Sequence, residues 1–150
     1  MLFRSTAKEY AYRYRNAYRQ ILWVNAESGT TIEAAYRYFA ERNRIGSTKD
    51  DSETVIRNVK TWMQENNHWL FIYDNAENEK SLEKYCSLSL KAGQHILVTS
   101  RNRLFQKFQP INISVFKETE ACKFIKKYTK KPADEYFKVL AKKMGYFCSQ

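Results

Sequence analysis

The chain has 150 residues, about the size of one domain, and 43% of them are hydrophobic while 15% are aromatic. This composition excludes a disordered polymer, and the low counts of 4 glycines and 2 prolines disfavour a loop-rich or all-β protein. The formal net charge is +10, and much of the excess comes from lysines in the last third of the chain. Such lysines attract phosphates or acidic partners, or they form solvated helix faces.

The cysteines and the hydropathy pattern bear on location. The 3 cysteines show no Cys-x-x-Cys spacing, which fits a reducing compartment, and with only 2 histidines the chain has no zinc-site spacing. We see no signal peptide and no stretch of about 18 apolar residues. We therefore expect a cytoplasmic protein that is not attached to a membrane.

The first predicted elements are a helix, a strand and a second helix. Apolar residues recur at three- and four-residue steps over residues 5–19, which predicts an amphipathic helix whose tyrosines pack inward. The β-branched run of residues 21–26 is typical of a buried strand. Thr30 or Thr31 can cap the second helix. The residues expected on the inner face of that helix are Ala34, Ala35, Tyr38 and Phe39.

The middle of the chain contains two strong strand patterns. A third helix is predicted to begin near Asp50, Asp51 and Ser52 and to carry an apolar stripe from Val55 to Met63. The aromatic run Trp69–Tyr73 predicts a buried strand. A short helix from Ser81 to about Ser87 follows, and then a second strand over His95–Thr99.

The C-terminal third is predicted to be mostly helical. A last, weaker strand is expected over Ile111–Val115, followed by two helices. Ala121, Phe124, Ile125 and Tyr128 are expected to line one of them, and Ala133, Phe137, Leu140, Ala141 and Met144 the other. Strands separated by helices imply right-handed crossovers and a mainly parallel sheet, so the expected fold is a three-layer α/β sandwich.

Polar residues follow the two strongest strands. Asp74 and Asn75 come after the first, and Thr99, Ser100 and Arg101 end the second. Ligands of open α/β sheets bind beyond the carboxyl ends of the strands, where these side chains are expected. The Asp74 carboxylate can hold Mg²⁺ that bridges nucleotide phosphates, or it can simply cap or turn the chain.

The second polar group also has two interpretations. The Arg101 guanidinium can pair with a terminal phosphate through a fork of donors, while the hydroxyls of Thr99 and Ser100 orient water or ligand. The alternative is a surface arginine that neutralises Asp74 or Glu77.

Three segments, in this order and spacing, resemble one known family. They are WVNAES at Trp23–Ser28, HWLFIYDNAEN at His68–Asn78 and GQHILVTSRN at Gly93–Asn102. They are similar to the nucleotide-binding domain of NB-ARC proteins, which belong to the STAND class of P-loop NTPases and whose bacterial members often carry tetratricopeptide repeats. The similarity covers roughly residues 7 to 147.

The resemblance implies a signalling switch that binds ADP at rest and ATP when active, with Mg²⁺. Asp74 matches the Walker B aspartate, and Arg101 matches the arginine that senses the nucleotide phosphates. Asn75 stands where many relatives have a second acid, which disfavours hydrolysis because an amide cannot act as a general base. Residues 1–116 would be a partial nucleotide-binding core, and residues 117–150 would begin the helical part of the domain.

The chain departs from the family pattern at both ends. MLFRST occupies the place of the GxGGxGKT phosphate loop, and Gly145-Tyr146-Phe147 is followed by Cys148-Ser149-Gln150 instead of Pro-Leu-Ala. We expect a shortened relative of the family, with nucleotide binding weak or lost and no turnover of ATP. The missing first strand would leave uncovered sheet edges, which favours self-association or a protein partner.

Two other functions compete with this one. The lysine-rich C-terminal helices predict a basic interaction module that binds nucleic acid or an acidic protein, with Tyr128, Tyr136, Phe137 and Tyr146 available for stacking or, on the inner stripe, for the core. A third interpretation is a chain without activity of its own.

Overall fold

The structure is a computed structural model that describes residues 2–86, 89–102, 105–111, 113, 117–130 and 135–143. Its contacts divide the chain into two compact units. One unit is Thr6–Pro110, and the other combines Met1–Ser5 with Ile111–Gln150. The predicted boundary between residues 116 and 117 adjoins residues 114–116, which lie outside the described part of the chain.

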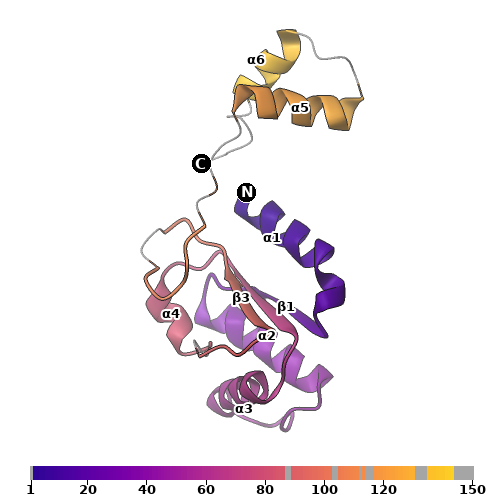
Figure 1. The fold of residues 1–150 in the computed structure, drawn as a ribbon. Coiled ribbons are helices and arrows are strands. Elements are labelled where there is room, and N and C mark those ends of the chain that lie inside the picture. Colours follow the sequence, from indigo (N-terminus) through magenta and orange to yellow (C-terminus); the bar gives the residue numbers. More distant parts are fainter. Residues whose placement is uncertain are drawn as a thin grey trace. The chain divides into compact units, whose positions relative to one another are not determined.

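The larger unit is built on an open, parallel, three-stranded sheet (Figure 1). The strands are β1 (Gln20–Asn25), β2 (Trp69–Asp74) and β3 (Gln94–Val98), and β2 lies in the middle. All six residues of β2 are buried, as its unbroken apolar sequence predicts for a central parallel strand. The predicted parallel α/β arrangement is therefore confirmed for this unit.

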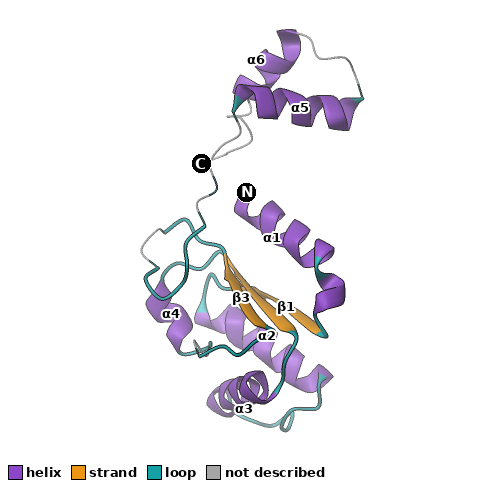
Figure 2. Ribbon diagram, in the orientation of Figure 1, coloured by secondary structure: helices purple, strands orange, loops and turns teal. Residues whose placement is uncertain are grey.

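Helices cover both faces of the sheet (Figure 2). Helix α1 (Leu2–Arg13) packs on one face, where its Ala7 joins Leu70 and Ile72 of β2 in a small apolar cluster. Three helices cover the opposite face and belong to the main core: α2 (Gly29–Arg42), α3 (Ser52–Glu65) and α4 (Glu79–Glu83). The side chains of β2 alternate between these two clusters, as strand geometry requires.

The main core is aromatic and centres on Phe71 of β2. Its ring lies 5.2 Å from that of Phe39 and 5.1 Å from that of Trp69, both in edge-to-face geometry. Beside it, the Tyr36 hydroxyl donates to the backbone oxygen of Tyr85 at 2.6 Å. Because the Tyr36 hydroxyl has one hydrogen and donates it to Tyr85, the Tyr73 hydroxyl must be the donor to Tyr36 Oη, at 2.5 Å.

The predicted helix over residues 5–19 is wrong in its extent and in one packing residue. Helix α1 ends at Arg13, and a short 3₁₀ turn over Arg15–Ala17 follows. Tyr10 and Tyr18 pack against the sheet as expected, but Tyr14 is 51% exposed. The Tyr14 ring packs against Tyr10 at a centroid distance of 4.7 Å and does not join the sheet cluster, although the periodicity places this residue on the inner stripe.

Helix α2 also differs in its cap and inner face. Ser28, rather than Thr30 or Thr31, caps the helix, and its Oγ accepts from the backbone N–H of Thr31 at 3.2 Å. Ala34 and Tyr38 are exposed instead of buried, whereas Phe39 is buried as predicted and Ala35 is partly buried against the core. The buried residues are Ile32, Tyr36, Phe39 and Ala40, one step round the helix from the predicted face.

Helix α3 follows the prediction closely. Asp51 caps it, and the Asp51 carboxylate accepts from the backbone N–H of Thr54 at 2.7 Å. The predicted apolar stripe is buried at Val55, Ile56, Val59 and Met63. Helix α4 is shorter than the predicted Ser81–Ser87 helix, whose last residue lies outside the described part of the chain.

The smaller unit contains the helices α5 (Glu118–Thr129) and α6 (Glu135–Lys143). Its core consists of Ala121, Ile125, Phe137 and Ala141. Phe124 and Leu140, predicted to face inward, are 36% and 42% exposed because the core of this helix pair is a narrow stripe.

Several C-terminal predictions fall wholly or partly outside the description. Ile111 and Ile113 do not form a strand, and the rest of the predicted Ile111–Val115 strand lies outside the described residues. Ala133, Met144 and Tyr146 also lie outside the described residues, as does the side chain of Tyr128. None of the described helices has the length and apolar character needed to cross a bilayer.

Candidate functional site

The candidate site lies at the edge of the sheet where the strands end. Asn25 is the last residue of β1 and stands opposite Asp74, the last residue of β2, in the parallel register. Thr99 follows β3 directly and continues this edge. Because all three strands are parallel, their carboxyl ends meet here, which is where ligands of open α/β sheets bind.

A hydrogen bond across this edge joins two of the predicted residues. Thr99 Oγ1 donates to Asp74 Oδ1 at 2.7 Å, and both side chains are buried, with 8% and 5% exposure. Thr99 Oγ1 also accepts from the backbone N–H of Asn75 at 2.9 Å. One hydroxyl therefore orients the carboxylate and fixes the backbone just after it.

The predicted polar residues also hold the turn that leaves β2. Asn75 has a left-handed backbone with φ 64°, a conformation that asparagine tolerates better than most residues. The Ala76 N–H donates to the Thr99 carbonyl at 2.9 Å, and Ser100 Oγ donates to the Ala76 carbonyl at 2.6 Å. The segments that follow β2 and β3 are thus tied together by Thr99 and Ser100.

Arg101 is the exposed cation next to this edge. Its side chain is exposed, and it makes no hydrogen bond or ion pair with any residue that the structure describes. The alternative in which it neutralises Asp74 or Glu77 is therefore not observed among these residues. Its guanidinium can turn to an anion held at the carboxyl edge.

Asp74 is the one site residue with a hard, charged ligand for a metal. Within the described ranges, no group of three or more histidine, cysteine, aspartate or glutamate side chains could hold a metal ion. Mg²⁺ is usually held by one or two carboxylates together with waters and substrate phosphates. A single carboxylate beside the neutral Asn75 provides fewer ligands than a resident metal needs, and it suits a Mg²⁺ that brings nucleotide phosphates as further ligands.

Sequence reasoning missed Asn25 as part of this edge. Its Oδ1 accepts from the Glu27 N–H at 3.2 Å, and the following Ala26 N–H donates to the Asp74 carbonyl at 2.8 Å. Ser28 then caps α2 from the same connection. A polar residue at the end of an apolar run, the pattern that predicted Asp74 as a site residue, also identifies Asn25 at the end of β1.

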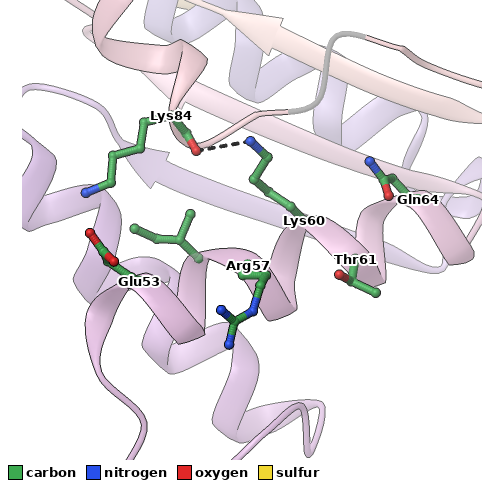
Figure 3. A pocket seen from close by; sticks show the side chains of 7 residues that line it. Glu53, Arg57, Lys60, Thr61, Gln64 and Lys84 are labelled. Atoms are coloured by element: carbon green, nitrogen blue, oxygen red, sulfur yellow. Dashed lines mark hydrogen bonds between the residues drawn. The ribbon is translucent and has the colours of Figure 1, made fainter.

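A hollow that the structure describes lies elsewhere, beside α3 (Figure 3). It is an open depression of about 380 Å³, and Lys60 Nζ donates across it to the Lys84 carbonyl at 3.3 Å. Its lining residues are Glu53, Ile56, Arg57, Lys60, Thr61, Gln64 and Lys84. It contains none of the carboxyl-edge residues, so we locate the candidate site by strand geometry and not by cavity size.

The fold and this edge define an open parallel α/β protein with a polar carboxyl edge. Comparison of the chain with protein-family models and with curated proteins finds no match.

Proposed function

We propose that the chain is an NB-ARC-like module that binds an adenine nucleotide with Mg²⁺ at its carboxyl edge and serves as part of a signalling switch. The observation that carries this proposal is the Thr99–Asp74 hydrogen bond, which holds a buried carboxylate beside the strand that leads to the exposed Arg101. This pair of charges suits a metal-bound phosphate: Asp74 faces the cation and Arg101 the anion.

The same arrangement supports binding without efficient hydrolysis. The family's phosphate loop has no counterpart in MLFRST, so the backbone cradle and the lysine that grip the phosphates are absent from this segment. Asn75 offers an amide where a general base would be needed. Mg²⁺, when bound, would neutralise phosphate charge, and Arg101 would contact the terminal phosphate. We therefore propose weak ADP or ATP binding without turnover of ATP.

Calorimetry with Mg·ADP tests this function. We expect a weak exothermic titration of the wild-type chain that is lost in Asp74→Asn, which keeps the shape of the side chain, and reduced in Arg101→Ala. Arg57→Ala is the matched control, because Arg57 is an exposed arginine on α3 outside the carboxyl edge. Absence of heat at millimolar Mg·ADP, or equal titrations of all four proteins, would rule out the function.

A second candidate function is supported by the helix pair. The lysines of α5 and α6 are all exposed, and so is Tyr136 with 78% of its surface. This favours a basic module that binds nucleic acid or an acidic protein. Replacing Lys126, Lys127 and Lys130 by glutamine should then lower the salt concentration at which the protein leaves a DNA column, and an unchanged elution would exclude this use of α5.

The sheet edges favour a protein partner or self-association. Ile96, Leu97 and Val98 of β3 are only partly buried, whereas the neighbouring residues of β2 are completely enclosed. An apolar edge strand with this exposure can accept another strand. Sedimentation at increasing concentration should reveal association, and a constant monomer mass would contradict it.

A further inference from the structure

We propose that an exposed apolar stripe on α6 binds an amphipathic helix of a protein partner, one whose own apolar residues are flanked by acidic side chains. This α6 stripe consists of Tyr136, Val139 and Leu140. The proposal rests on the second candidate function, in which the helix pair is a basic module, and it selects an acidic protein over nucleic acid. It does not depend on nucleotide binding at Asp74.

The first observation is that α6 has two apolar sides. Phe137 and Ala141 are four residues apart and buried, and they form the core of the smaller unit together with residues of α5. Tyr136, Val139 and Leu140 follow one another at steps that place them on a different, common side, since the second and third lie three and four residues after the first. The core uses the first side, so the second is available to another molecule.

The second observation is the exposure of this stripe. Tyr136 is 78% exposed, Val139 50% and Leu140 42%. Single exposed apolar residues are common on protein surfaces, but three on one side of a short helix form a patch, and an apolar patch rimmed by charge is typical of a protein-binding site. The nine residues of α6 extend over about 13 Å, so the stripe fits about two and a half turns of a partner helix.

The third observation is the charge beside the stripe. Lys142 and Lys143 are exposed and lie in the last turn of α6. Lys142 follows Val139 by three residues, and Lys143 follows Leu140 by three, so both lysines border the stripe. Within the described part of the chain neither lysine is in an ion pair. Carboxylates that flank the apolar residues of a partner helix would therefore find two cations next to the stripe.

The charge also decides between the possible occupants. The sequences of α5 and α6 contain six lysines and three glutamates, and the last turn of each helix is basic, so two copies of this helix pair repel each other. Nucleic acid would contact the lysines but leave Val139 and Leu140 in water, because neither side chain can stack on a base or bind phosphate. An amphipathic helix with acidic flanks uses the apolar stripe and the lysines together.

Fluorescence anisotropy of a designed peptide, titrated with the complete chain, tests the proposal. The probe is a labelled helical peptide of about 18 residues, with leucines at three- and four-residue steps and glutamates beside them. We expect weak, reversible binding. The double variant Val139→Ala, Leu140→Ala should bind about tenfold or more weakly, because each buried methylene contributes about fourfold to affinity. Lys142→Gln should weaken binding at low salt and have less effect at high salt.

The chain offers a matched control for the stripe. Leu90 is 41% exposed, like Leu140, but belongs to the larger unit, so Leu90→Ala should bind the peptide like the wild type. A peptide of the same composition in scrambled order has no apolar stripe and should bind much more weakly. Circular dichroism verifies that each variant keeps its helices, which alanine favours.

Several results would overturn the proposal. Equal affinity of the wild type and the double alanine variant would do so, as would equal affinity for the two peptides. A response to Lys142→Gln without a response to the double alanine variant would keep the basic module and refute the stripe. Binding of oligothymidine in preference to the peptide would assign the module to nucleic acid, and a dimer that the double alanine variant loses in sedimentation would assign the stripe to a second copy.

Discussion

Thr99 Oγ1 donates a hydrogen bond of 2.7 Å to Asp74 Oδ1. Asp74 is the last residue of the central strand β2, and Thr99 directly follows the neighbouring strand β3. The same Thr99 hydroxyl accepts from the Asn75 N–H, so it uses both its donor and an acceptor position at the carboxyl edge. Packing and the candidate site therefore depend on one side chain. A change at Thr99 should alter the stability of the fold and the orientation of the carboxylate together.

Thr99→Val should lower the free energy of unfolding by about 1–3 kcal/mol. Valine has nearly the shape of threonine but cannot donate to Asp74, so it leaves a buried carboxylate oxygen without this donor. Urea denaturation followed by fluorescence measures the loss. Thr99→Ser, which keeps the hydroxyl, is the control and should retain most of the stability. Equal stability of the valine and threonine proteins would show that the bond contributes nothing.

The buried tyrosine pair should respond unequally to loss of its two hydroxyls. Tyr36→Phe removes the acceptor for Tyr73 and the donor to the Tyr85 carbonyl, so it should cost about 1–3 kcal/mol. Tyr73→Phe leaves the Tyr36–Tyr85 bond intact and should cost less. Chemical denaturation of both variants tests the order. A greater loss in Tyr73→Phe would contradict the donor directions that we assign.

The cap of α3 should make stability depend on pH in the acid range. The hydrogen bond from the Thr54 backbone lowers the pKa of Asp51 in the folded chain. A lowered pKa means that the carboxylate stabilises the fold above its unfolded pKa of about 3.9, and that this stabilisation is lost as the pH falls through the folded value.

Asp51→Asn is the variant that isolates this charge, because asparagine can also cap a helix. The wild type should be more stable than the variant at pH 6, and the difference should shrink to nothing near pH 2. Thermal melting at both pH values measures it. A difference that stays constant over this range would mean that the carboxylate charge has no part in the cap.

Cys86 should be the slowest of the described thiols to react in the folded protein. It is buried, and burial raises the pKa of its thiol to about 11, so only about one in a thousand of these groups is ionised at pH 8. Cys122 is partly exposed. Iodoacetamide treatment followed by peptide mass spectrometry should label Cys122 first and Cys86 only in urea. Labelling of Cys86 at the rate of Cys122 would contradict its burial.

The strands could be predicted from the sequence because each contains a continuous apolar run. The run Trp69–Tyr73 forms most of the central strand, and its side chains are buried on both faces of the sheet. The start of α3 near Asp51 and its apolar stripe are also local patterns and were predicted correctly. The parallel order of the sheet followed from the helices between the strands.

Contacts between distant segments could not be predicted in this way. The bonds of Tyr36 to Tyr73 and of Thr99 to Asp74 join residues on different elements, and their partners are set by tertiary packing. Tyr14 was placed inward by periodicity, but its ring packs against Tyr10 and stays 51% exposed. The site residues were identified from strand ends, whereas the hydrogen bonds that orient them emerged only from the fold.

The most direct test of the central claim is an NMR titration of the ¹⁵N-labelled chain with Mg·ADP, observed at the backbone amides. If the carboxyl edge binds the nucleotide, the amide signals of Asn75, Ala76 and residues 99–102 should move first, and Asp74→Asn should abolish these shifts. Unchanged spectra at millimolar Mg·ADP, or shifts confined to α3 or to the lysines of α5 and α6, would contradict a nucleotide site at this edge.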